Sequence, residues 1–223
     1  MTIAKEILSE NKSLDVGALY NIAKRQLKLS RKGLLDIIKI LLNNKFLVEG
    51  SKFTRETVLS NQDRKHIYFF IKQSLGVHFS LIKKHFFSEK EDSVGSSGQL
   101  SWHLGLLLKF DYIKKVKFKK YLIILPIELE PEVGIYYFLL RDENNNAIVK
   151  LLIEQETVKK SDIYKNLKGS RETIYYHIDS LINDKIIVEE PGANNNIYIN
   201  PDKKDIIIEV LKNTQYENRK KQK

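Results

Sequence analysis

The 223-residue chain contains no cysteine. That absence excludes disulfide bonds, thiol catalysis, cysteine-ligated zinc and cysteine-based redox sensing. Long apolar runs are missing too, since no uncharged apolar stretch reaches the roughly 18 residues that a membrane-spanning helix needs. The most apolar candidate, residues 121–140, is interrupted by glutamates and prolines. We therefore expect no membrane span.

Signatures of enzymes are also missing. The sequence has no glycine-rich phosphate loop, nucleophile elbow, zinc-protease motif or paired-carboxylate motif. Residues 1–6 are typical of an amphipathic helix with an early acid, not of a signal peptide. We expect a soluble, cytoplasmic protein that is not an enzyme and needs no cofactor.

The positive charge is unevenly distributed. Residues 1–57 carry 11 Lys and Arg against 6 acids, residues 58–126 carry 12 against 5, and residues 127–223 carry 15 against 17. The net charges are therefore +5, +7 and −2, within a total of +10. A positive field confined to the first 126 residues can attract a polyanion. The alternative is that lysine serves only as a solubilising residue.

A repeat organises the chain. The stretch Leu100–Leu104, followed by Tyr112-Ile113, matches Ile174–Ile178, followed by Ile186-Ile187, at a constant offset of 74 positions. At an offset of 66, Leu34 falls on Leu100, but the aromatic-His pair is absent from that first copy. Each copy has the pattern of a helix followed by extended runs, which predicts a small domain used three times.

Hydrophobic periodicity and turn signals place the elements. The first copy shows three helical patterns, then a predicted hairpin of Lys45–Val48, a turn at residues 49–52 and Phe53-Thr54. In the second copy, a Gly- and Ser-rich stretch (residues 89–98) is expected to be a mobile loop. Asn144–Asn146 is expected to be a break in the regular structure before the third copy.

The expected fold class is mainly α with small β-hairpins (α+β), in three tandem domains. The predicted parts are residues 1–57, residues 58–126 with a basic hairpin, a connecting helix in residues 127–142, residues 143–211, and a disordered basic tail in residues 212–223.

Three helices closed by a β-hairpin form a winged helix-turn-helix. The residues Ser170, Thr173-Ile174, Tyr176–Ile178, Leu181 and Ile186-Ile187 resemble the recognition-helix stretch of ArsR/MarR-like regulators. Ser96, Gln99-Leu100, Trp102–Leu104 and Tyr112-Ile113 look like a second instance. The tandem arrangement is similar to archaeal transcription regulators with several winged helices. Winged helices also bind proteins, as in ESCRT-II subunits and RNA-polymerase-associated subunits.

The resemblance implies that the third helix of each copy reads DNA through its N-terminal residues. The implied contacts are Ser30, Arg31 and Lys32 in the first copy, Ser97, Gln99 and Ser101 in the second, and Ser170, Arg171, Thr173 and Tyr175 in the third. Gln99 could pair with adenine and Arg171 with guanine. The alternative is that the serines cap helices and the other residues face solvent.

The predicted hairpin of the second copy is strongly basic, with five cations in seven residues and no acid: Lys114, Lys115, Lys117, Lys119 and Lys120. In the winged fold this hairpin is the wing, and binding to a phosphate backbone would relieve the crowding. The alternative is an edge strand that uses lysine against aggregation. The third predicted wing, residues 189–196, has two acids and no base.

The histidines are His66, His78, His85, His103 and His177, and they are scattered along the chain. Their spacing does not favour a metal site. We expect a regulator that binds double-stranded DNA. The alternative is a non-enzymatic scaffold that binds proteins, and the third domain with the last helix is a candidate for a protein partner or a homodimer.

Overall fold

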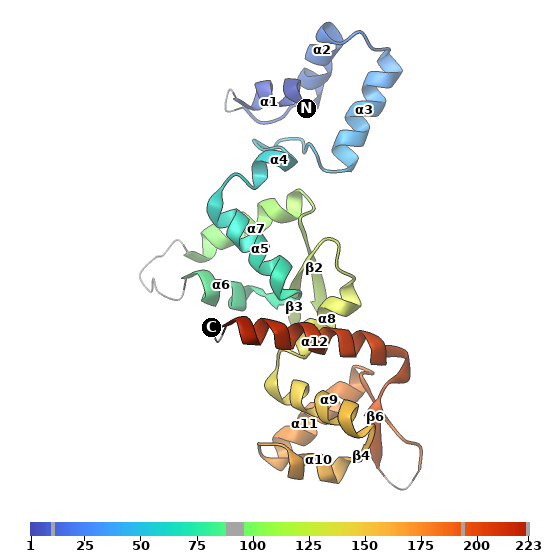
Figure 1. Ribbon diagram of the computed structural model, residues 1–223. Helices are drawn as coiled ribbons and strands as arrows, with labels where there is room; N and C mark the ends of the chain where they lie inside the picture. Colours follow the sequence, from blue (N-terminus) through green and yellow to red (C-terminus); the bar gives the residue numbers. More distant parts are fainter. Residues whose placement is uncertain (10–11, 88–95, 193–194, 222–223) are drawn as a thin grey trace. The chain divides into compact units, whose positions relative to one another are not determined.

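The computed structural model describes residues 1–9, 12–87, 96–192 and 195–221. The chain forms two compact units, Met1–Glu128 and Leu129–Lys223 (Figure 1). Both units are mainly helical with small antiparallel sheets, so the expected class, mainly α with small β-hairpins, is confirmed. None of the described helices has the length and apolarity to span a membrane.

The first unit begins with α1 (Thr2–Ser9), α2 (Val16–Gln26), α3 (Arg31–Asn43) and the short α4 (Arg55–Val58). Asp15 caps α2 through the backbone N–H of Ala18, and Ser30 caps α3 through the N–H of Gly33. One face of each of the first three helices is buried in a cluster of Ala4, Leu14, Leu19, Ala23, Leu34, Ile38 and Leu47.

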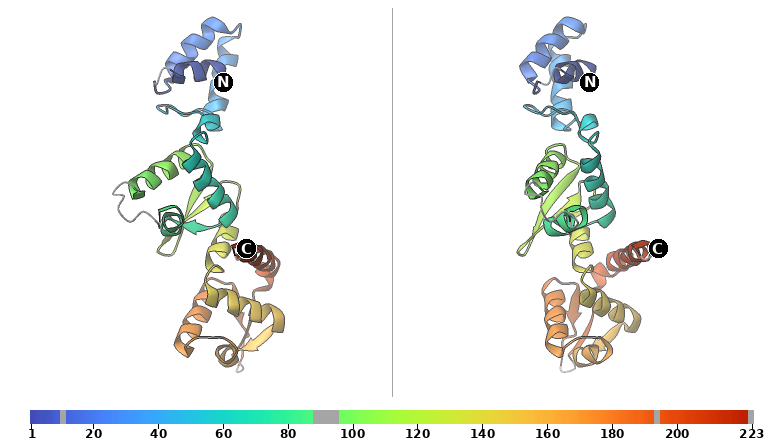
Figure 2. Two further views of the ribbon diagram at one scale, coloured as in Figure 1. Left: turned by 60° about the vertical axis from the view of Figure 1, so that its left-hand side comes forward. Right: turned by 90° about the vertical axis from the view of Figure 1, so that its left-hand side faces the viewer.

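The hairpin predicted at Lys45–Thr54 is wrong. Within the described part of residues 1–58 there are helices and loops but no strand (Figure 2). Thr54 instead forms a capping box with Thr57 at the start of α4, which removes the return strand. Two backbone bonds still link the loop to Leu14, which accepts from Gly50 N–H and donates to Ser51 C=O.

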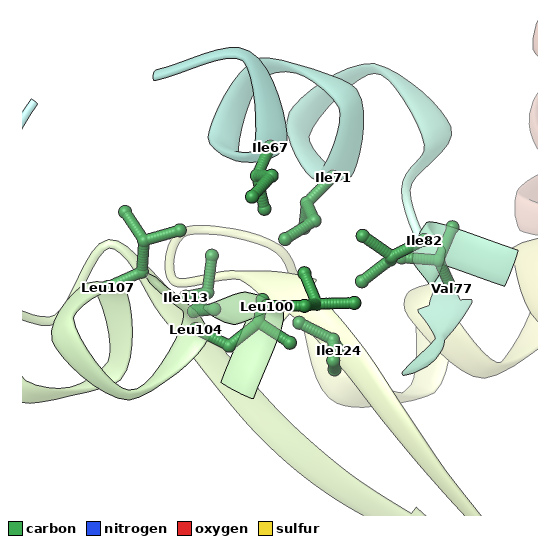
Figure 3. Close-up of a cluster of buried hydrophobic side chains, with 9 residues drawn as sticks. All are labelled: Ile67, Ile71, Val77, Ile82, Leu100, Leu104, Leu107, Ile113 and Ile124. Atoms are coloured by element: carbon green, nitrogen blue, oxygen red, sulfur yellow. The ribbon is translucent and has the colours of Figure 1, made fainter. Parts of the chain in front are cut away.

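The rest of the first unit contains α5 (Gln62–Ser74), β1 (Val77–His78), α6 (Phe79–Phe87), α7 (Ser96–Lys109), β2 (Ile113–Phe118) and β3 (Tyr121–Pro126). The sheet order is β1-β3-β2, and both pairings are antiparallel. Aliphatic side chains from α5, α6, α7 and all three strands converge in one cluster: Ile67, Ile71, Val77, Ile82, Leu100, Leu104, Leu107, Ile113 and Ile124 (Figure 3).

The predicted loop at residues 89–98 is wrong at its end, because Ser96–Gly98 already belong to α7. Residues 88–95 lie outside the described residues. The two-residue strand β1 was not predicted, since two residues are too few to show a period.

The second unit begins with α8 (Pro131–Leu139), α9 (Glu143–Gln155), β4 (Thr157–Lys159), α10 (Lys160–Asn166) and α11 (Arg171–Asn183). Strands β5 (Ile187–Glu189) and β6 (Asn196–Ile199), the 3-10 helix η1 (Pro201–Lys203) and α12 (Lys204–Lys221) follow. The sheet order β4-β6-β5 repeats the order of the first sheet.

Two expectations for the second unit are wrong. Asn144–Asn146 do not interrupt the chain, because Asp142 caps α9 through the N–H groups of Asn144 and Asn145. The tail is not disordered from residue 212, since α12 extends to Lys221. Its Lys, Gln, Glu and Arg residues are good helix formers, although they are polar.

The repeat is visible in the backbone. The residue two positions after α3, α7 and α11 has a positive φ in each case: 56° at Lys45, 53° at Asp111 and 57° at Lys185. The next residue (Phe46, Tyr112 or Ile186) accepts a backbone hydrogen bond from a residue farther along the chain. Helix, strand, helix, helix and hairpin follow in the same order from α5 and from α9, as in a winged helix.

Candidate nucleic-acid interface

The basic hairpin is formed by β2 and β3. Its register pairs Ile113 with Pro126 and Phe118 with Tyr121, and the turn is Lys119-Lys120, with a φ of 51° at Lys119. Successive side chains of a strand point to opposite faces. Lys115 and Lys117 therefore share a face with the core residue Ile113, while Lys114 lies on the other face.

The lysines differ in their electrostatic surroundings. Lys115 and Lys117 are exposed and have no acidic partner within the described residues. Lys114 is half-buried and lies near Glu128, which also forms an ion pair with Lys72 at 3.2 Å. Partial burial acts to raise the pKa of Glu128, but a backbone hydrogen bond and the charges of Lys72 and Lys114 hold that pKa below its ordinary value. The face that carries Lys115 and Lys117 therefore has the uncompensated charge.

Helix α7 packs beside this hairpin. Leu100, Leu104 and Leu107 face the core, whereas Gln99 and Ser101 are exposed and Ser97 is half-buried. The predicted recognition residues of the second copy thus lie on the solvent side of a helix that contacts β2. This is the arrangement in which a recognition helix and a wing can contact one duplex together.

In the first copy, Arg31 and Lys32 are exposed at the start of α3, and the Ser30 hydroxyl accepts from Gly33 N–H at 3.1 Å. Their surroundings differ from those in α7. The exposed side of α3 carries three large aliphatic residues, Leu35, Ile37 and Ile40, the last of them 57% exposed. Since no hairpin follows α3, no wing accompanies Arg31 and Lys32.

In the third copy, most of the predicted polar contacts are used locally. Ser170 Oγ accepts from Thr173 N–H at 3.2 Å and lies 3.0 Å from Thr173 Oγ1. The Arg171 guanidinium lies over two rings, 5.6 Å from the centroid of Tyr164 and 5.2 Å from that of Tyr175. These contacts match the helix-cap alternative for Ser170, while Arg171 remains exposed.

Acids dominate the hairpin of the third copy. Glu189 forms an ion pair with Lys160 at 3.4 Å, and Lys160 also binds Asp179 at 2.6 Å. Glu190 accepts a hydrogen bond from Asn196 at 2.7 Å. Residues 193–194 lie outside the described part. The described part of this hairpin thus has no counterpart of the exposed Lys115 and Lys117.

Two polar junctions, one beside α11 and one beside α7, were not predicted. In the second unit His177 Nδ1 lies 2.8 Å from Asn145 Oδ1, and Nε2 lies 3.3 Å from Asn144 Nδ2. Asn145 also donates to the carbonyl of Leu139 at 2.9 Å. The sequence signal that was missed is Asp142, a good N-cap residue directly before these asparagines.

The equivalent junction in the first unit contains a buried cation. Arg64 is 1% exposed, donates to the carbonyl of Val58 and lies over the rings of Phe53 and Trp102. His103 is also 1% exposed, and neither ring nitrogen has a hydrogen-bond partner among the described residues. Burial first, and then the charge of Arg64, lower the pKa of His103.

The other histidines do not form a cluster. His85 stacks on Phe70 at 4.1 Å between ring centroids. Within the part of the chain that the structure describes, no group of three or more His, Cys, Asp or Glu side chains could hold a metal ion.

Comparison with known proteins gives one significant relative. The chain is 28% identical over 171 residues to an uncharacterised HTH-type transcriptional regulator of Methanocaldococcus jannaschii. The matched region is 75% of this chain and 41% of the relative, so the chain spans less than half of that protein. No protein-family profile and no solved structure match significantly. By sequence, the chain is similar to a protein named as an HTH-type transcriptional regulator.

Proposed function

We propose that the protein is a DNA-binding transcriptional regulator and not an enzyme. The observation that carries the proposal is the β2–β3 hairpin, where Lys115 and Lys117 have no acidic partner among the described residues. Strand β2 contacts α7, which exposes Gln99 and Ser101. Such uncompensated cations gain free energy by displacing counterions from phosphates. The name of the archaeal relative supports the same class.

We further propose three tandem helix-turn-helix domains in residues 1–57, 58–126 and 143–211, of which the second and third are winged, with a connecting helix in residues 127–142. The repeated positive φ at Lys45, Asp111 and Lys185 supports this division. In this arrangement α7 enters the major groove and the lysine hairpin follows the phosphates. Arg31, Lys32 and Arg171 are secondary contacts.

The salt dependence of binding to duplex DNA tests this function. If about six phosphates are contacted, a plot of log K against log salt concentration has a slope near −5. Binding is measured by fluorescence anisotropy of a labelled duplex from low to moderate salt. Replacing the five hairpin lysines by Gln should flatten the slope. Five Lys→Gln changes in unit 2 (Lys150, Lys159, Lys168, Lys185 and Lys204) are the matched control.

A scaffold that binds proteins is the second candidate. The exposed aliphatic residues Leu35, Ile37 and Ile40 on α3 favour it, since a helix that reads DNA gains little from them. The acidic hairpin of the third copy suits a protein partner, or a homodimer formed with α12. A chain that binds no duplex at low salt would support this candidate over the regulator.

A further inference from the structure

The solvent side of α7 carries the only tryptophan of the chain. Trp102 is 52% exposed, whereas His103 and Leu104 beside it are buried. At 100° per residue, Trp102 points away from the face formed by Leu100, Leu104 and Leu107. An exposed indole offers a large, rigid apolar face to a ligand, with an N–H donor at its edge.

One face of the indole already has a partner. The Arg64 guanidinium lies 4.8 Å from the ring centroid of Trp102 and 5.1 Å from that of Phe53. A hydrogen bond to the carbonyl of Val58 holds this buried cation in place. The His103 ring also packs on the indole, with 4.9 Å between ring centroids and 62° between the planes. With both neighbours in place Trp102 is still 52% exposed, so about half of the residue's surface remains open to a ligand.

The helix surface on either side of the exposed indole is open. Gly98 and Gly105 stand four residues before and three residues after Trp102, so they are its neighbours on the helix surface. A Cβ added at either glycine would meet no heavy atom within 4 Å. Glycine weakens an exposed helix relative to alanine, and packing does not require it here. A flat group can therefore approach Trp102 closely.

We propose that Trp102 is a stacking platform for an unpaired DNA base, at a mismatch, a bulge or a locally opened duplex. This inference rests on the proposed function, in which α7 and the lysine hairpin hold DNA. Bases of a paired duplex stack on each other and offer only their edges, whereas an unpaired base can place its face on an aromatic ring. Exposed Gln99 and Ser101, within one turn, can bond to the edge of that base.

Helix α11 provides the internal comparison. Tyr176 holds the position of Trp102 and is 71% exposed. Within the described residues no cation lies over the Tyr176 ring, and the hairpin that follows α11 is acidic. Tyr176 is thus an exposed aromatic residue without a backing cation or a basic wing, so it is the matched control.

The test uses the full chain and two duplexes of the same sequence, one fully paired and one with a single bulged adenine. The bulged duplex should bind about tenfold tighter, as expected for one base stacked on an aromatic ring. It should also quench the emission of Trp102, which is the only tryptophan signal. Trp102→Leu keeps an apolar side chain without a flat face and should bind the two duplexes alike. Tyr176→Ala should keep the preference.

Equal affinity of the wild type for both duplexes, or a preference that survives Trp102→Leu, overturns the stacking proposal. The proposed function then still stands if the paired duplex binds with a steep salt dependence. Failure to bind either duplex at low salt overturns the proposed function itself. If Trp102→Leu does not fold, Trp102→Phe replaces it; this variant keeps part of the stacking surface and should keep part of the preference for the bulged duplex. The quenching of wild-type Trp102 emission by the bulged duplex is the second measurement.

Discussion

Arg64 and Asn145 make the same contact in two successive units. Each side chain donates to the backbone carbonyl six residues earlier, Arg64 to Val58 and Asn145 to Leu139. Each is the third residue after a capping side chain, and each adjoins a histidine, His103 of α7 or His177 of α11. The end of α4 or α8 is thereby tied to the next helix, and through it to α7 or α11.

The first prediction concerns this tie. Asn145→Ala removes the bond to Leu139 and the Asn145 acceptor of His177 Nδ1. Weaker contacts with Asp142 remain, at 3.3 Å from its N–H to the Leu139 carbonyl and 3.5 Å from its carboxylate to His177 Nδ1. The expected loss in the free energy of unfolding of unit 2 is about 1–3 kcal/mol, measured by urea denaturation. Asn183→Ala, at an exposed position of α11, is the control and should change it little. Equal effects of the two variants would contradict the role of Asn145.

His103 gives a prediction about pH. Its pKa in the folded protein is lowered by burial and by the charge of Arg64, although the charge of Asp63 acts in the opposite direction. The unfolded chain then binds a proton at a higher pH than the folded chain does. Stability is therefore complete above the unfolded pKa of about 6.5, and is lost as pH falls from there toward the folded pKa.

The slope from one such group is at most about 1.4 kcal/mol per pH unit. We expect His103→Leu to be less sensitive to acid than the wild type when urea unfolding, followed by Trp102 emission, is compared at pH 8 and 5.5. A wild type and a variant with the same pH dependence would show that His103 does not titrate with folding.

Variants of Ser170 distinguish a helix-capping role from a direct contact with DNA. Ser170→Ala removes the acceptor of the Thr173 N–H, and the expected cost is about 1 kcal/mol of stability. Ser170→Asp keeps a capping oxygen and should retain that stability. Since the hydroxyl is used in the cap, Ser170→Ala should leave the affinity for duplex DNA unchanged at a temperature where the protein is folded. A loss of affinity without a loss of stability would show a direct contact instead.

The helices were predictable because the apolar period and the capping residue indicate the same position for each helix. Ser30 caps α3 and Asn61 caps α5, and both are residue types that are favoured at a helix N-cap. The prediction of a hairpin at Lys45–Thr54 was wrong because two local preferences compete there. Its return strand would have been Phe53-Thr54, but Thr54 gains more from capping α4. In the second copy, β2 and β3 have six residues each and pair along their whole length.

The candidate site was less predictable than the fold. The crowding of lysines is visible in the sequence, but their division between two faces depends on the register of β2 and β3. The aliphatic surface of α3 around Ile40 also went unnoticed, because a period alone does not reveal which apolar residues remain exposed. The contact between Arg64 and Trp102 joins residues far apart in the chain, so spacing could not reveal it.

The two faces of the hairpin give the last prediction. Each phosphate contact that is lost should change the slope of log K against log salt concentration by about one. The double variant Lys115→Gln, Lys117→Gln should therefore flatten the slope by about two. Lys114→Gln should change it by less, because Glu128 already compensates part of the charge of Lys114. The double variant Lys168→Gln, Lys185→Gln in unit 2 removes the same charge and should leave the slope unchanged. If it flattens the slope equally, net charge and not the hairpin governs binding.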